Sequence, residues 1–296
     1  MLNSRSGASS RGDLPAVLER VLGAAGQKYE LVPTTSGLDA AARRAAELAE
    51  REQGVIVAAG GDGTIRCVAE QALRVRGPLG IIPQGTNNIT GRTWDIPLEA
   101  EAAVEALLNS RVRRVQVGRV NGLVFLVNAS LGLYPELLEE REQFKQRFGR
   151  KRSVGLLAAL VTLMRHHRHL VLDSEHEAGR ELIEAATLFV GNNAMQFEDV
   201  GLPEAEDVQR GKLAAVFAKP VGRLHRLGLF ARGLVGKLAG DSALHDFAFE
   251  QLIVRPRRGH KPTLKVALDG EIMRLAPPLK FSVAPEPLLL LTPAGG

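Results

Sequence analysis

The stretch Gly54-Val55-Ile56-Val57-Ala58-Ala59-Gly60-Gly61-Asp62-Gly63-Thr64 indicates the fold class of this chain. Residues 55–59 are all apolar, which is typical of a strand buried on both faces of a parallel sheet. Glycines follow, and then a predicted helix over residues 64–74 with Thr64 as a suitable N-cap. This strand–turn–helix order predicts an open α/β sheet, whose ligands bind at the carboxyl ends of the strands.

The glycine turn predicts a phosphate-binding loop. Gly60, Gly61 and Gly63 let the backbone approach a phosphate closely, and the N–H groups at a helix start favour an anion. Asp62 would repel a phosphate. Its presence therefore indicates that it either acts together with Mg²⁺ or accepts a proton from an alcohol. The alternative is a plain Gly-Asp-Gly turn with no ligand.

Two further segments extend this candidate site. The segment 83–88, Pro-Gln-Gly-Thr-Asn-Asn, follows the next predicted strand. Two Gly/Thr loops at the ends of neighbouring strands can hold one polyphosphate from two sides. The segment 268–271, Leu-Asp-Gly-Glu, is either a simple hairpin turn or the carrier of a functional carboxylate, Glu271.

The rest of the chain divides into two parts with different patterns of predicted secondary structure. Up to about residue 108, helices predicted over 14–25, 38–51, 64–74 and 98–108 alternate with strands over 29–33, 54–59 and 79–83, which predicts an α/β domain with a parallel sheet. Beyond it, predicted strands dominate, at 112–117, 123–128, 182–190, 213–218, 247–254, 263–268, 280–283 and 288–291. These predict an all-β, sandwich-like domain with basic helical insertions at 135–169 and 221–238. We place the boundary near Gly118, giving domains 1–118 and 119–296.

Composition limits the functional classes. The chain has 296 residues, 45% hydrophobic and 24% charged, as expected for a soluble globular protein of two domains. Its one cysteine, Cys67, can form no internal disulfide and no cysteine metal cluster, which favours a reduced cytoplasmic setting. The net charge of +5 either favours anionic partners or has no specific meaning.

Membrane crossing is not expected. The start of the chain lacks the apolar run of a signal peptide. The longest membrane-like stretch, residues 155–164, is half the roughly twenty residues that a spanning helix needs. Any contact with a membrane is therefore expected at its surface, where basic amphipathic helices can lie.

Taken together, these segments resemble the diacylglycerol kinase catalytic family over nearly the whole chain. The matching segments, in the family's order, are 3–7, 60–64, 85–88, 127–132, 190–193 and 269–271. The resemblance implies a phosphofructokinase-like α/β domain followed by a β-sandwich domain, with the active site between them. It also implies transfer of the γ-phosphoryl group of ATP to a lipid hydroxyl, with Mg²⁺.

The resemblance also implies roles for single residues. Glu271 would be the base that deprotonates the hydroxyl, and Asp62 would lie on the phosphate and metal side. The residues implied to bind the nucleotide are Asn3, Thr34, Gly60, Gly61, Gly63, Thr64, Gly85, Thr86 and Asn88. The metal ligands stay open beyond Asp62.

Several positions depart from the family pattern. Arg66-Cys67 stands where Asn-Glu is usual, and Ile89 follows Asn88 where an aspartate is common. Arg210 replaces an aspartate that supports a structural metal in related bacterial enzymes, and arginine cannot ligate Mg²⁺. Either Arg210 supplies the positive charge of that metal, or the metal network has decayed and activity is weak or lost.

The start of the chain departs as well. The family has an apolar strand before the loop that corresponds to residues 3–7, but here only Met1 and Leu2 precede Asn3. Either this strand is missing from the sequence or the start was assigned too late. A sheet without it would expose an edge or a gap.

Three functions follow as alternatives. The first is an active lipid kinase acting on diacylglycerol or a related lipid at the inner membrane surface. The second is a catalytically impaired member of the fold that binds nucleotide or lipid, and the third is an NAD kinase relative, against which the 83–88 loop and Asp269-Gly270-Glu271 argue. We expect no nucleic-acid partner and no evident protein partner, while a homodimer stays open.

Overall fold

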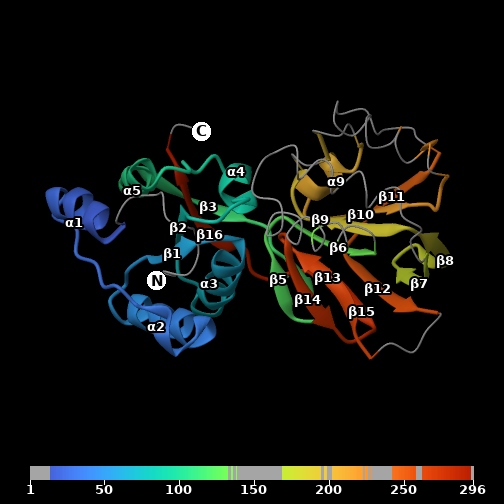
Figure 1. Ribbon diagram of the computed structural model, residues 1–296, viewed down its shortest axis with the longest axis horizontal. Coiled ribbons are helices and arrows are strands. Elements are labelled where there is room, and N and C mark those ends of the chain that lie inside the picture. Colours follow the sequence, from blue (N-terminus) through green and yellow to red (C-terminus); the bar gives the residue numbers. More distant parts are fainter. Residues whose placement is uncertain are drawn as a thin grey trace, which may run out of the picture. The chain divides into compact units, whose positions relative to one another are not determined.

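The computed structural model describes residues 14–132, 135, 138, 169–194, 197–198, 202–222, 224–225, 228, 242–257 and 262–294. The chain forms two compact units (Figure 1). Unit 1 comprises residues 1–117 and 284–296, and unit 2 comprises residues 118–283. Both predicted basic insertions fall almost wholly outside the described residues. Within the described residues, no helix is long and apolar enough to cross a membrane.

Unit 1 is an α/β unit built on a four-stranded sheet. The strands lie in the order β1 (Ile56–Gly60), β2 (Leu79–Pro83), β16 (Leu288–Pro293) and β3 (Ser110–Val115). The strands β1, β2 and β16 run parallel, and β3 is antiparallel to β16. This confirms the predicted parallel sheet.

Helices cover both faces of this sheet (Figure 1). The helices α1 (Leu14–Ala24) and α5 (Ala100–Leu108) pack on the face that carries Ala59 and Ile82. The helices α2 (Leu38–Arg51) and α3 (Asp62–Val75) pack together and contact β1. The short helices η1 (Thr34–Ser36) and α4 (Ile89–Thr93) complete the unit.

The structure corrects several predictions in unit 1. Residues 29–32 belong to no strand, and within the predicted strand 29–33 only Pro33 forms an isolated bridge. The third helix begins at Asp62, with Gly61 as its N-cap, so Thr64 lies inside the first turn and is not the cap. The C-terminal segment 284–296 belongs to unit 1, which contradicts the predicted 119–296 domain, because β16 pairs with β2 and β3.

Unit 2 is a sandwich of two six-stranded sheets. One sheet has the order β11-β10-β9-β6-β13-β14 and the other β5-β4-β15-β12-β7-β8. A shared core of buried aliphatic and aromatic side chains, including Phe125, Phe217 and Phe281, lies between them. The bounds of the first sheet are β6 (Asn128–Gly132), β9 (Thr187–Gly191), β10 (Leu213–Ala218), β11 (Leu244–Phe249), β13 (Leu264–Leu268) and β14 (Glu271–Leu275). Those of the second are β4 (Gly118–Val120), β5 (Leu123–Phe125), β7 (Leu170–His176), β8 (Gly179–Ala185), β12 (Gln251–Pro256) and β15 (Leu279–Val283).

The predicted β-rich second half is thus confirmed, but its strand inventory was incomplete. The predicted strand 182–190 is two strands, β8 and β9, and 247–254 spans parts of β11 and β12. The strands β7 and β14 were not predicted at all. A short helix, α9 (Ala205–Gln209), precedes β10.

Candidate active site

The two predicted phosphate loops start side by side. The strands β1 and β2 are paired in parallel, and their last residues, Gly60 and Pro83, are register partners. The backbone N–H of Gln84 donates to the carbonyl oxygen of Gly60 at 2.8 Å. Both loops therefore leave the sheet at its carboxyl edge, where ligands of open α/β sheets bind.

The backbones of the two loops touch. A Cβ atom on Gly85 would lie 2.8 Å from the Cα atom of Gly61, and a Cβ atom on Gly60 would lie 2.6 Å from the Cβ atom of Thr64. Real Cβ atoms do not approach so closely, so glycine is required at these positions for steric reasons. Because these positions carry no side chain, an anionic ligand can approach the backbone of the loops closely.

Asp62 fastens the first loop to the second. Its side chain is buried, and its two carboxylate oxygens accept hydrogen bonds from the backbone N–H groups of Ile89 (3.1 Å) and Thr90 (2.9 Å). These N–H groups lie in the first turn of α4, where an intrahelical partner is lacking. Asp62 is therefore a capping group for a helix that follows the other loop.

Asn88 holds the second loop in shape. It adopts a left-handed backbone conformation with φ of 48° and is buried. Its Oδ1 atom accepts a hydrogen bond from the N–H of Gly85 at 2.7 Å. Asparagine tolerates this conformation better than most residues, so Asn88 shapes the loop that the resemblance assigned to nucleotide binding.

The remaining predicted nucleotide residues of unit 1 are placed as follows. Thr34 opens η1 and is half-buried, and Thr86 is exposed at the tip of the second loop. Gly63 is half-buried and Thr64 buried, both in the first turn of α3. Asn3 lies outside the described residues. The structure thus brings both glycine loops together.

In unit 2, Glu271 begins strand β14 directly after a two-residue hairpin turn. The turn residues Asp269 and Gly270 both have positive φ, 49° and 85°, and Leu268 pairs with Glu271. This is the Asp-Gly hairpin geometry that the sequence allowed. Glu271, the first residue of β14, is exposed.

A buried carboxylate anchors this hairpin. Asp269 is 1% exposed, and its oxygens accept hydrogen bonds from the backbone N–H groups of Leu126 (2.7 Å), Val127 (2.8 Å) and Asn128 (3.0 Å). The N–H of Asp269 in turn donates to the carbonyl oxygen of Asn128. Glu271 therefore stands two residues from a firmly held point of the fold.

Asn192 donates hydrogen bonds to carbonyl oxygens of the same segment, residues 126–128. Its side-chain Nδ2 donates to the carbonyl oxygen of Leu126 at 3.0 Å, and its backbone N–H donates to that of Val127 at 2.9 Å. The family-like segments 127–132, 190–193 and 269–271 are thus one hydrogen-bonded assembly. Sequence reasoning missed the roles of Asp269 and Asn192, because an Asp-Gly pair signals a turn but not the partners of its carboxylate.

Acidic side chains near Arg210 form two ion pairs. Arg210 pairs with exposed Glu206 at 3.1 Å, whereas Lys212 pairs with Asp207 at 3.2 Å. Burial, together with a hydrogen bond to Asp246, raises the pKa of Glu204 to about 7. Whether Arg210 supplies the charge of a metal, or the metal network has decayed, stays a prediction.

The fit of the implied ligands differs between nucleotide and metal. The position of the two loops at the carboxyl edge of β1 and β2 suits a polyphosphate, because anionic ligands of open α/β sheets bind there. A resident metal fits less well, since both oxygens of Asp62 already accept N–H groups. No group of three histidine, cysteine or acidic side chains that could hold a metal occurs in the part of the chain that is described.

Comparisons with known proteins agree with this arrangement. Residues 1–120 match the diacylglycerol kinase catalytic domain. A Pseudomonas aeruginosa protein named "Probable lipid kinase YegS-like" is 32% identical over 275 residues, covering 90% of this chain and 86% of that protein. A diacylglycerol kinase of Bacillus subtilis is 40% identical over 116 residues, which are 38% of each chain.

The fold is shared with solved structures too. A crystal structure of a diacylglycerol kinase from Bacillus anthracis superposes with a TM-score of 0.68 at 17% identity, covering 99% of this chain and 96% of that one. The α/β unit with its two glycine loops and the β-sandwich that follows therefore define a known class of protein. The chain belongs to the diacylglycerol kinase catalytic-domain family.

Proposed function

We propose that this protein is a lipid kinase that transfers the γ-phosphoryl group of ATP to a hydroxyl of diacylglycerol or a related lipid. The observation that carries the proposal is the pair of glycine loops at the carboxyl edge of β1 and β2, fastened to each other through Asp62. Phosphoryl transfer requires mainly that the phosphates be positioned and their charge neutralised. Membership of the family supports the acceptor class.

In this proposal the phosphates of ATP lie against the backbone of the two glycine loops. The polar groups of Thr34, Thr86 and Asn3 complete the nucleotide site. A Mg²⁺ ion carried by the phosphates would neutralise part of their charge. Asp62 contributes by fixing the loops relative to each other, since its oxygens are occupied by N–H groups.

Glu271 acts as the general base. The lipid hydroxyl oxygen forms a bond to the γ-phosphorus, the bond from that phosphorus to the leaving oxygen of ADP breaks, and the hydroxyl proton passes to the Glu271 carboxylate. Such help is typically worth roughly 10²–10⁴-fold in rate. The side chain suits the task because it is exposed while its hairpin is anchored by Asp269.

The lipid is presented at a membrane surface. The net charge of +5 favours an anionic surface such as that of the inner leaflet. We propose peripheral association from the cytoplasmic side, without a nucleic-acid or other protein partner, while a homodimer stays open.

The test is ATP-dependent phosphorylation of lipid in mixed micelles with Mg²⁺. Glu271→Gln should lower kcat by at least 10²-fold with little change in KM for ATP. The matched control is Glu184→Gln, an exposed strand glutamate of the same unit, which should leave turnover unchanged. Equal activity of wild type and Glu271→Gln would refute the assignment of the base.

A second candidate is binding of nucleotide or lipid without turnover. It is favoured by the occupied oxygens of Asp62 and by Ile89 in place of an acid. ATP binding measured by calorimetry, together with no product from any lipid acceptor, would establish this candidate instead. Phosphorylation of NAD in the same assay would indicate the third, NAD kinase, alternative.

A further inference from the structure

The edge strand β3 of unit 1 carries a cluster of arginines. It is the last strand of the sheet on the side away from β1, and in the described residues no strand pairs with its outer edge. Its sequence, Ser-Arg-Val-Arg-Arg-Val, has four consecutive exposed residues at 111–114. We call these four residues, together with Trp94, the β3 patch.

The β3 patch has an excess of positive charge. Residues 106–135 contain four arginines and no aspartate or glutamate, and the register partners of β3 on β16 are uncharged. Arg113 and Arg114 form no ion pair with a described residue. By contrast, four other exposed arginines of unit 1 each pair with a glutamate: Arg20, Arg44, Arg51 and Arg76. The charge at this edge of the sheet therefore favours an anionic partner.

Apolar groups lie among these charges. Val112 is 56% exposed. The guanidinium carbon of Arg113 lies 5.2 Å from the centroid of the Trp94 ring, within the range of a cation–π contact. Because the side chains of a strand alternate between its two faces, Val112 and Arg113 point to opposite sides of the sheet. A flat surface that meets β3 along its outer edge would contact the side chains of both faces.

This combination of residues fits an anionic lipid surface. Arginine binds phosphate through its planar fork of donors, while its stem can lie against apolar groups. Tryptophan is enriched at membrane–water interfaces. A second copy of the chain fits poorly, because two β3 edges would bring arginines opposite each other. Nucleic acid also fits poorly, since Arg113 covers the face of the Trp94 ring on which a base would stack.

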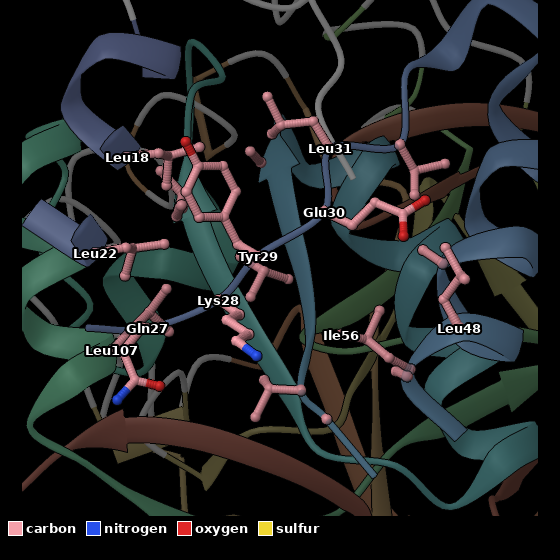
Figure 2. Close-up of a pocket in the computed structure, with 18 of the residues that line it drawn as sticks. Leu18, Leu22, Gln27, Lys28, Tyr29, Glu30, Leu31, Leu48, Ile56 and Leu107 are labelled. Atoms are coloured by element: carbon pink, nitrogen blue, oxygen red, sulfur yellow. The ribbon is translucent and has the colours of Figure 1, made fainter. Parts of the chain in front are cut away.

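An apolar groove of unit 1 is a weaker candidate for the same contact. It has a volume of about 700 Å³ and is lined by residues 27–32 and by β1, with leucines of α1 and α2 (Figure 2). Its charged lining residues are one cation, Lys28, and two acids, Glu30 and Glu52. An anionic surface is therefore not attracted to the groove, whereas it is attracted to the β3 patch.

We propose that the β3 patch is a docking site for an anionic phospholipid surface, with the outer edge of β3 against the headgroups. The inference rests on the proposed function, because a kinase of a membrane lipid must meet its substrate at such a surface. Arg113 and Arg114 bind headgroup phosphates, while Val112 and Trp94 lie at the level of the membrane–water interface. Each arginine near an anionic surface raises partitioning about fivefold, and salt screens this effect.

Trp94 allows a direct test, because it is the only tryptophan of the chain. The full chain is mixed, without ATP, with vesicles of phosphatidylcholine alone or of phosphatidylcholine and phosphatidylglycerol. Brominated acyl chains in the mixed vesicles should quench the fluorescence of Trp94, and its emission should move to shorter wavelength. Vesicles of phosphatidylcholine alone should do neither. Binding to the mixed vesicles without quenching would place the contact elsewhere and overturn the proposal.

Charge reversal in the β3 patch is compared with an equal charge reversal elsewhere in unit 1. Arg113→Glu/Arg114→Glu should lower the partition coefficient for the mixed vesicles at least ~25-fold in sedimentation. The matched control is Arg43→Glu/Arg74→Glu, at exposed positions of α2 and α3, which should lower it by less than about threefold. If the reversed strand does not fold, Arg113→Gln/Arg114→Gln should show a smaller loss than the reversal, but one still larger than that of the control.

Two results of this comparison would overturn the docking site. One is an equal loss of binding in the patch variant and the control, which would assign vesicle binding to net charge alone. The other is no loss in the patch variant, which would leave its arginines only the role of preventing edge-to-edge pairing. Tighter binding of the wild type to a single-stranded oligonucleotide than to the mixed vesicles, lost in the patch variant, would also overturn it in favour of nucleic acid.

Turnover separates this inference from the proposed function. In mixed micelles of nonionic detergent, Arg113→Glu/Arg114→Glu should keep the kcat of the wild type, and on mixed vesicles it should lose activity in parallel with binding. Vesicle binding through Trp94 without turnover of any lipid would uphold the docking site and refute the kinase proposal. Equal turnover of the patch and control variants on vesicles would refute the docking site alone.

Discussion

The anchoring of the Asp-Gly-Glu hairpin can be tested by Asp269→Asn. Asparagine keeps the left-handed backbone that φ of 49° requires, and Asn-Gly forms the same two-residue turn. Only the carboxylate is removed. Any loss of stability can therefore be assigned to the three hydrogen bonds that Asp269 accepts from Leu126, Val127 and Asn128.

The magnitude follows from those bonds. A hydrogen bond to a charged group contributes about 1.5–3 kcal/mol, against about 1 kcal/mol for a neutral one. Asparagine retains one acceptor oxygen, which can accept from the N–H groups of Val127 and Asn128. Its NH₂ group then faces the N–H of Leu126, so the hydrogen bond from Leu126 is lost. The lost bond and the two weakened ones together predict a loss of about 3 kcal/mol in the free energy of unfolding.

Urea unfolding followed by far-ultraviolet circular dichroism measures this loss. For a unit of this size it corresponds to a decrease in Tm of roughly 6–12 °C. Asp95→Asn is the matched control, because Asp95 also has positive φ but is exposed, and it should change stability by less than about 0.5 kcal/mol. A loss below about 1 kcal/mol for Asp269→Asn would refute the anchoring role.

Three further predictions concern the rest of the molecule. Gly85→Ala forces a Cβ atom to 2.8 Å from the Cα atom of Gly61, so ATP affinity should fall at least tenfold by calorimetry, and unchanged affinity would contradict the steric requirement. Because the pKa of Glu204 is raised to about 7, its contribution to stability is full below about pH 4.5 and is lost as pH rises through 7. Glu204→Gln should remove this pH dependence of the free energy of unfolding in urea titrations from pH 5 to 8. Identical pH profiles of the wild type and the variant would contradict the assignment. Burial raises the pKa of the Cys67 thiol to about 12, so intact mass should show no alkylation by iodoacetamide at pH 8 within an hour in the folded protein and complete alkylation in urea.

The sequence was sufficient for the parts of the site that depend on local order. Apolar residues 55–59 followed by glycines predicted β1 and its loop, and the repeat of that pattern at 79–88 predicted the second loop beside it. Both predictions held because a parallel pair of strands brings its carboxyl ends to one edge without further information. The Asp-Gly turn at 269–270 was readable for the same reason.

Long-range pairing was not readable. The apolar segment 288–293 has the pattern of any buried strand, and nothing in it specifies that it returns to unit 1 to lie between β2 and β3. The segment 29–33 has a strand pattern but no strand neighbour, so a pattern that is locally correct gave a wrong element. The acceptor role of Asp269 depends on N–H groups more than 140 positions away.

Asp62 shows why loss of activity alone would be poor evidence for a catalytic role. The sequence favours a metal or proton-transfer function, whereas the structure commits both carboxylate oxygens to the N–H groups of Ile89 and Thr90. If fastening the loops is its role, Asp62→Ala should lose about 3 kcal/mol of stability, and Asp62→Asn, which keeps one acceptor, about half of that. KM for ATP should then rise in both variants in the same order, with a smaller effect on kcat. If Asp62 instead acts on the reacting groups, Asp62→Asn should lose kcat by 10²-fold or more while its Tm stays near that of the wild type, and that result would overturn the fastening role.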